Sequence, residues 1–243
     1  MEQITNPGLK YILYEIAGRE HLLKVGMLKK KIRGGDSLCD LDRFNEILCS
    51  LIAEDSAHML MAPSCSFHLN GGILNMEKKG QYVEDLRAES LNRNVLVFPG
   101  SFVWADKGKL YNSTPIIYNG KILFEYYKRT DGGENELGLR YGLEPVFGGK
   151  NSGIFAWKDY KLGIELCGDN HEGVLKDDKK VSDLDFHIVL ASGRSYLYDQ
   201  TIIAKPGGYA FLCDGMNPKT EVRQVLEDGR TKQIKPISIK LVD

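Results

Sequence analysis

Five cysteines are the side chains of this 243-residue chain best suited to covalent chemistry, because a cysteine thiolate is both a nucleophile and a metal ligand. They are Cys39, Cys49, Cys65, Cys167 and Cys213. The number is odd, no two of them form a C-x-x-C pair, and no zinc-site spacing is present. We therefore expect free thiols in a reducing compartment, and we ask whether any of them is a nucleophile.

Three short segments end apolar runs abruptly, at places where rigid elements tend to present functional side chains. They are Met61 to Ser64, Glu125 to Arg129 and Gly163 to Asp169. The second segment contains Lys128 and the third contains Cys167. Taken alone, Cys167 would more often be an apolar core residue and Lys128 a solvated lysine, so the segments matter more than the residue types.

The elements that must position these segments are mostly short strands, which apolar runs bounded by turn residues predict. The expected strands are Tyr11 to Tyr14, Leu22 to Met27, His58 to Met61, Val95 to Phe98, Leu110 to Tyr118, Ile122 to Tyr127, Gly153 to Trp157, Tyr160 to Leu166, Phe186 to Leu190 and Tyr209 to Cys213. Asn119-Gly120 predicts a tight hairpin, and Lys158-Asp159 predicts a second one.

Three segments have helical spacing: Asp40 to Glu54, more weakly Gln81 to Asn92, and about Gly193 to Ala204. Strand–helix–strand units and hairpins are mixed, and no repeat or long linker divides the chain. Residues 1–243 are therefore expected to form one layered α/β domain whose strands are partly antiparallel.

Charge and hydropathy exclude several classes of protein. The 32 basic and 33 acidic residues nearly cancel, which gives no electrostatic reason to expect a nucleic-acid or membrane partner. No apolar run approaches the length of a membrane span, and charged residues interrupt every candidate signal segment. No phosphate-binding, dinucleotide-binding or serine-hydrolase motif is present. The expected protein is soluble and cytoplasmic.

The lysine and cysteine segments resemble those of the carbon–nitrogen hydrolase (nitrilase) superfamily. That family has a Pro-Glu pair after a buried strand, a Tyr-x-Lys-like segment, and a Gly-(Ile/Val)-x-(Ile/Leu)-Cys-x-Asp segment. Tyr126-Tyr127-Lys128 and the run from Gly163 to Asp169 match the last two. Val97 to Ser101 and the run Asp185 to Ser192 are also similar to the family. The resemblance covers roughly residues 55 to 215, so the tail after about residue 215 is atypical.

The resemblance implies a role for each matched residue. Cys167 would attack an amide or nitrile carbon and form a thioester, which water then hydrolyses. Lys128 would stabilise the thiolate and the developing oxyanion, and the backbone N–H of Gly168 would be the second oxyanion donor.

Ser64 stands where the family has its catalytic glutamate. A serine hydroxyl is not a base near neutral pH, so it cannot carry the proton that the glutamate carries, a transfer worth about 10²–10⁴-fold. Three explanations are open: hydrolysis has been lost, another carboxylate takes over, or Ser64 replaces a natural glutamate.

Glu144 is the first candidate for a substitute or second carboxylate, followed by Glu136 and Glu134. Glu165 would share a face with Cys167 only if its strand is regular. Asp169 is expected to fix the loop after Cys167. The carboxylates around His171 give too little support for a metal site.

The resemblance implies a four-layer α-β-β-α sandwich with mixed parallel and antiparallel sheets, and no cofactor or metal. The expected function is hydrolysis of a non-peptide C–N bond in a linear amide or carbamoyl-type small molecule. Acyl transfer to an amine shares the thioester step and stays open. The alternative is a catalytically silent protein that binds a ligand or partner. The family commonly forms homodimers or larger homo-oligomers, so we expect the same here.

Overall fold

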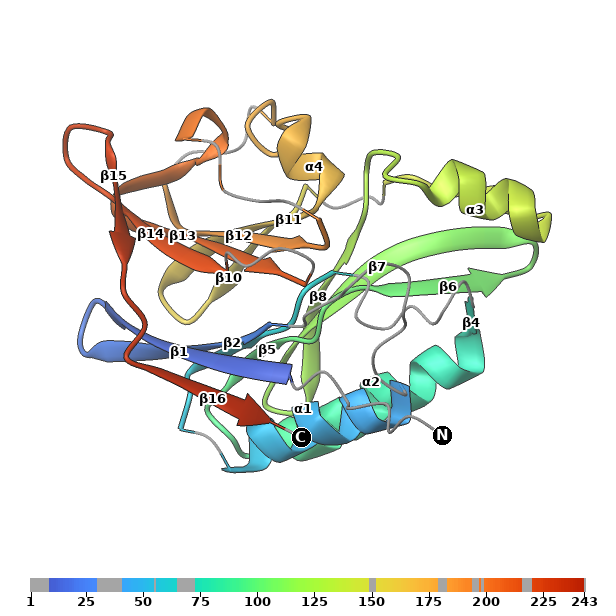
Figure 1. Cartoon of the computed structure of the whole chain (residues 1–243), viewed down its shortest axis with the longest axis horizontal. Helices are drawn as coiled ribbons and strands as arrows, with labels where there is room; N and C mark the ends of the chain where they lie inside the picture. The colour runs from blue at the N-terminus through green and yellow to red at the C-terminus, as the bar shows by residue number, and fades with distance from the viewer. Residues whose placement is uncertain are drawn as a thin grey trace, which may run out of the picture.

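Two β-sheets packed face to face form the centre of the protein (Figure 1). The computed structural model describes residues 9–29, 41–54, 56–64, 73–148, 152–178, 183–193, 197, 199–215 and 220–242. Cys39 and Cys65 lie outside the described residues.

The larger sheet has ten strands in the order β16-β1-β2-β3-β5-β7-β6-β4, with β8 and β9 also paired to β7. Its strands are β1 (Leu9–Ala17), β2 (Leu22–Lys29), β3 (Met59–Met61), β4 (Leu74–Asn75), β5 (Leu96–Phe98), β6 (Phe102–Asp106), β7 (Lys109–Tyr118), β8 (Lys121–Tyr127), β9 (Glu144–Pro145) and β16 (Ser238–Val242). β2, β3 and β5 run parallel, whereas β7 and β8 form the hairpin predicted at Asn119-Gly120.

The smaller sheet has six strands in the order β10-β11-β12-β13-β14-β15. They are β10 (Ile154–Trp157), β11 (Tyr160–Leu166), β12 (Leu184–Ala191), β13 (Ala204–Asp214), β14 (Glu221–Val225) and β15 (Thr231–Ile234). The three central strands, β11, β12 and β13, are parallel. Their carboxyl ends therefore meet at one edge of the sheet, and Cys167 follows the first of them.

The helices that the structure describes are α1 (Leu41–Glu54), α2 (Met76–Ser90), α3 (Glu134–Tyr141), α4 (Gly168–His171) and the 3₁₀ turn η1 (Asp199–Thr201). Helices α1 and α2 lie outside the larger sheet and α4 outside the smaller one, whereas α3 packs against β9 and β7 (Figure 1). The predicted four-layer α-β-β-α order is thus confirmed, with a thin helical layer over the smaller sheet in the described part of the chain.

The main core lies between the sheets because side chains alternate along each strand. Val25 of the larger sheet and Ile164 and Phe211 of the smaller one belong to this core and are fully buried. A second cluster joins α1 and α2 to the larger sheet, and a third, smaller cluster covers the outer face of β12 and β13. The strands that carry the candidate residues are therefore rigid.

Two predicted helices differ from the structure. The helix expected from about Gly193 to Ala204 lies partly outside the described residues, and its described part is not an α-helix: Gly193 has a φ of 118°, Asp199–Thr201 form the 3₁₀ turn η1, and Ala204 begins β13. The helix expected from Gln81 begins five residues earlier, at Met76, because the side chain of Asn75 caps the N–H of Lys78. Gly80 in its second turn obscures that start in the sequence.

Candidate active site

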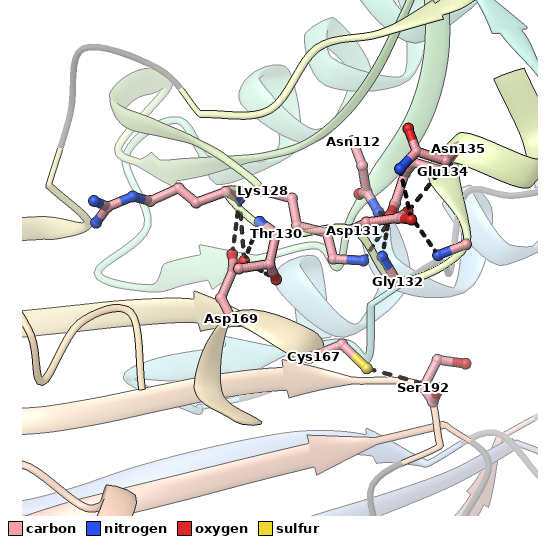
Figure 2. Close-up of polar contacts among 12 residues, drawn as sticks. Asn112, Lys128, Thr130, Asp131, Gly132, Glu134, Asn135, Cys167, Asp169 and Ser192 are labelled. Carbon is pink, nitrogen blue, oxygen red and sulfur yellow. Dashed lines mark hydrogen bonds and ion pairs between the residues drawn. The ribbon is translucent and has the colours of Figure 1, made fainter. Parts of the chain in front are cut away.

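Cys167 occupies a strained turn between β11 and α4. Its backbone angles are φ 45° and ψ −101°, a region that non-glycine residues rarely adopt. Its N–H donates to the carbonyl of Leu190 at 2.9 Å, which fixes the turn against β12. The side chain is partly exposed, and Sγ lies 4.0 Å from the carbonyl oxygen of Ser192 (Figure 2). Such strain persists only where the surroundings hold it, and it is concentrated at functional sites.

Lys128 follows β8 directly and is buried, with 4% of its surface exposed. Its Nζ lies 2.7 Å from Oε1 of Glu134, the first residue of α3. The same oxygen accepts a hydrogen bond from Asn112 Nδ2 at 2.8 Å, and Oε2 accepts one from the N–H of Gly132 at 2.6 Å (Figure 2). The ammonium group is therefore held in one position by a buried carboxylate that is itself held by two further donors.

The turn that brings Glu134 back to Lys128 requires glycine. A Cβ on Gly132 would collide with Nζ of Lys128, and Gly133 has a φ of 115°. Asp131 fixes the start of α3, since its carboxylate accepts the N–H groups of Gly133 and Asn135. Burial alone would raise the pKa of Asp131, but these hydrogen bonds to its carboxylate outweigh burial and lower the pKa.

Asp169 joins the lysine segment to the cysteine segment. Its carboxylate accepts hydrogen bonds from the Tyr126 hydroxyl at 2.8 Å and from the N–H and hydroxyl of Thr130 at 2.8 and 2.7 Å. The N–H of Arg129 is a further donor, at 3.1 Å. Burial raises the pKa of Asp169, although these donors oppose the rise. Residues on both sides of Lys128 are thus fastened to the residue two positions after Cys167, in keeping with the loop-fixing role expected for Asp169.

Gly168 lies directly after Cys167 and packs closely against the lysine segment. A Cβ at this position would lie 3.2 Å from Thr130 Oγ1 and 3.6 Å from the carbonyl oxygen of Asp131. A larger residue would push the two segments apart, so glycine lets the backbone after Cys167 lie against Thr130 and Asp131.

Ser64 is 4% exposed, and its Oγ has no hydrogen-bond partner in the described part of the chain. It follows β3, and the preceding Pro63 lies near Gly215, where a Cβ would contact Pro63 at 3.2 Å and Ser192 Oγ at 3.9 Å. The segment ending in Ser64 therefore approaches the same strand ends as Cys167. A buried hydroxyl without a partner is unfavourable, and it marks the position where the resemblance places a carboxylate.

The candidate carboxylates occupy different places. Glu134 contacts Lys128, whereas Glu144 is exposed on β9, opposite Lys109 of β7. Glu136 is exposed and pairs with Arg140 at 3.5 Å. Glu165 is buried against His187 on the outer face of the smaller sheet. The structure gives the role of lysine partner to Glu134, and none of the described contacts supports Glu144 in it.

Asn112, which contacts Glu134 and Lys128, and the buried His187, which contacts Glu165, are residues that sequence reasoning missed. Asn112 holds both Glu134, through its side chain, and the backbone N–H of Lys128, through its carbonyl at 2.9 Å. The signal for it is weak, because Asn112 lies in the polar stretch Asn112-Ser113-Thr114 of β7. His187 interrupts the apolar run of β12.

Solved structures share this arrangement of strands. A mutant of the amidase from Nesterenkonia sp. AN1, showing Michael addition of acrylamide at the active-site cysteine, matches with a TM-score of 0.65 and 14% identity, over 91% of this chain and 92% of that one. XC1258 from Xanthomonas campestris, a CN-hydrolase superfamily protein with an arsenic adduct in its active site, matches with a TM-score of 0.64 and 14% identity, over 90% and 89%.

Nit3 of Saccharomyces cerevisiae, a member of branch 10 of the nitrilase superfamily, gives a TM-score of 0.64 and 16% identity, over 89% and 88% of the two chains. The chain has the nitrilase-superfamily fold. The resemblance stated from the sequence is confirmed at the level of the fold, over nearly the whole length of these structures. No protein-family model matches the sequence, and no curated protein sequence matches it.

Two classes of feature are not found on this nitrilase-like fold within the described residues. No three His, Cys, Asp or Glu side chains gather in a group able to hold a metal ion. None of the described helices combines the length and apolar character needed to cross a membrane.

Proposed function

We propose that the protein hydrolyses a non-peptide C–N bond, in a linear amide or carbamoyl-type small molecule, through a thioester on Cys167. The observation that carries this proposal is the set of hydrogen bonds at Asp169, which joins the segment of the buried, carboxylate-paired Lys128 to the strained turn at Cys167. A positive charge held near a cysteine favours the thiolate and stabilises the oxyanion that forms when the thiolate attacks a carbonyl.

In the first step, the Cys167 thiolate attacks the carbonyl carbon, and the C–S bond forms as the carbonyl π electrons move to oxygen. The Lys128 ammonium and the N–H of Gly168 stabilise the resulting oxyanion. The carbonyl then re-forms, the C–N bond breaks, and the amine leaves with a proton. Water attacks the thioester, which releases the carboxylic acid and returns the thiol.

The proton must travel from the thiol to the amine, and later from the water to the thiol. Glu134 is our candidate for this role in place of Glu144, because it is the carboxylate in contact with Lys128. Its Oε1 accepts two hydrogen bonds and its Oε2 one, so Oε2 keeps acceptor capacity for a proton or a water. Its first role is to orient Lys128.

A second candidate function is a catalytically silent protein that binds a small molecule or a partner in the retained site. Ser64 is the observation that favours it, because the buried hydroxyl offers no base where the resemblance places one. A third outcome, acyl transfer to an amine, shares the thioester and differs only in the molecule that attacks it.

Amide turnover on a substrate panel tests the proposal, using the parent protein and the variants Ser64→Glu and Cys167→Ala. The proposal expects turnover by the parent that Cys167→Ala abolishes. Inactivity of both the parent and Ser64→Glu on every amide would favour the silent binder, and added amines appearing in the product would indicate acyl transfer. Assembly as a homodimer or larger oligomer, independence of cofactors and a cytoplasmic location remain part of the proposal.

A further inference from the structure

A buried acid–base pair lies behind the candidate nucleophile. Glu165 of β11 and His187 of β12 are 1% and 0% exposed, and Nε2 of His187 lies 2.9 Å from Oε2 of Glu165. The strands are parallel, with Gly163 opposite His187 and Glu165 opposite Val189, so the two side chains are diagonal neighbours on the outer face of the sheet. Charged groups are rarely buried in a strand without a specific use.

Glu165 holds the segment that follows Cys167. Oε2 accepts a hydrogen bond from Asn170 Nδ2 at 2.8 Å, and Oε1 accepts one from the N–H of Leu175 at 2.7 Å. Burial raises the pKa of Glu165, but the bonds from His187, Asn170 and Leu175 outweigh it and lower the pKa. The carboxylate is therefore charged at neutral pH and binds both ends of this segment with charge-assisted hydrogen bonds.

The same face of the sheet has few other anchors in the described chain. α4 has only four residues, and η1 has three. Gly163 leaves space for the segment to lie against the strand, since a Cβ there would clash with the side chains of Leu175 and Leu184. Within the described residues, a polar network centred on Glu165 holds the segment after Cys167 against this face.

Cys167 therefore lies between two buried carboxylates. Asp169, two residues after it, is fastened to the lysine segment, and Glu165, two residues before it, is fastened to the segment 170–175. The unfavourable backbone of Cys167 must be fixed from both sides for its Sγ and the N–H of Gly168 to keep their positions.

We propose that the Glu165–His187 pair is a positioning device for the Cys167 nucleophile, acting through Asn170 and the N–H of Leu175. The inference rests on the proposed function in that it concerns the same thiol. Its test measures the reactivity of that thiol without any need for amide turnover.

The experiment measures the rate at which iodoacetamide labels Cys167 at pH values from 6 to 9, using peptide mass analysis, and compares this rate between the parent protein and variants. The variants are Glu165→Gln and the apolar pair Glu165→Met/His187→Leu. Replacing both partners of a buried polar pair by apolar groups of similar volume can be nearly neutral for stability, and urea unfolding of the double variant separates lost positioning from lost folding. Asp185→Asn, at the start of β12, is the matched control, because Asp185 is also buried and bound by several donors.

We expect labelling of Cys167 to slow by about 10- to 100-fold in both Glu165 variants, the scale of small displacements at a reacting group. The control should keep the parent rate. Where the parent turns over an amide, kcat should fall with KM unchanged. A folded double variant with the parent labelling rate would overturn the inference. If that variant does not fold, the labelling rate of Asn170→Ala tests the inference instead, because this substitution removes the hydrogen bond from Asn170 to Glu165. Slow labelling together with no amide turnover by any form would support the inference and refute only the proposed function.

Discussion

Nζ of Lys128 lies 2.7 Å from Oε1 of Glu134, and both side chains are buried at the end of β8. Asn112 and the N–H of Gly132 complete the surroundings of the carboxylate. A buried charge is tolerated only when it is paired and hydrogen-bonded, so each partner of this pair depends on the other.

Glu134→Gln should therefore lower both stability and activity. Loss of one partner from a buried ion pair costs about 3–5 kcal/mol, which urea unfolding would measure as a drop in the free energy of unfolding. Amide turnover should fall by about 10²-fold as Lys128 loses its position. Glu144→Gln is the control, and a change there within about 0.5 kcal/mol is expected for an exposed residue. Loss of activity in Glu144→Gln with an unaffected Glu134→Gln would return the role to Glu144.

Asp169→Asn should loosen the connection between the lysine and cysteine segments. The amide oxygen of Asn can replace only some of the acceptor sites used by Tyr126, Arg129 and Thr130, so a loss of about 2–3 kcal/mol is expected. Tyr126→Phe, which removes one donor, should cost about 1 kcal/mol. Urea unfolding of both variants measures the difference. Equal free energies of unfolding for Asp169→Asn and the parent would show that the hydrogen bonds at Asp169 do not contribute to stability.

Ser64→Glu should increase amide turnover, because it supplies a base at the position of a buried hydroxyl that has no hydrogen-bond partner among the described residues. General acid–base catalysis predicts a gain of about 10²–10⁴-fold. Ser64→Gln has the same length and no basic carboxylate, so it should gain nothing. Steady-state kinetics on one amide measures all three proteins. Equal turnover by Ser64→Glu and Ser64→Gln would mean that the missing carboxylate does not limit the reaction.

The described cysteines should differ in reactivity. Burial, followed by nearby acidic side chains, raises the pKa of Cys49 to about 12, and burial raises the pKa of Cys213 well above its ordinary value. Both are therefore almost entirely thiols at pH 8, whereas Cys167 is partly exposed and lies in the turn that Asp169 ties to the lysine segment. Timed alkylation with peptide mass analysis should show Cys167 labelled first. Faster labelling of Cys49 would contradict an activated Cys167.

Asp185 should make stability depend on pH in the acid range. Burial opposes its charge, but Lys205, the N–H of Lys161 and Arg19 prevail and lower its pKa. Its contribution is therefore complete above the pKa of an unfolded Asp, about 3.9, and is lost as the pH falls through the lower folded value. Asp185→Asn should cost about 1–3 kcal/mol at pH 7 and progressively less below pH 4. A difference that does not vary between pH 7 and pH 2 in urea unfolding would refute this assignment.

The sequence predicted those parts of the site that depend on local pattern. Apolar runs that stop abruptly placed Lys128 and Cys167 at strand ends, because buried strands have recognisable composition and length. Asn119-Gly120 likewise predicted the β7–β8 hairpin, which orients Lys128. Strand ends and hairpin turns can be predicted because they depend only on residues that are close together in the sequence.

The contacts that the sequence did not predict form between segments that a turn or strand pairing brings together in the fold. Glu134 reaches Lys128 only because Gly132 and Gly133 turn the chain back, so distance along the sequence gave no preference for it over Glu136 or Glu144. The pairing of Glu165 with His187 depends on the register of two parallel strands, which side-chain pattern alone does not specify.

The most direct test of the account is intact-mass analysis of the protein mixed with an amide or activated ester and quenched in acid within seconds. The account predicts a mass increase equal to the acyl group, located on Cys167, labile to hydroxylamine as a thioester is, and absent in Cys167→Ala. The leaving group of an activated ester needs no proton, so Ser64 should slow mainly the hydrolysis of the thioester and the adduct should accumulate. Product formation without any acyl adduct, or an adduct that persists in Cys167→Ala, would contradict the claim that Cys167 is the nucleophile.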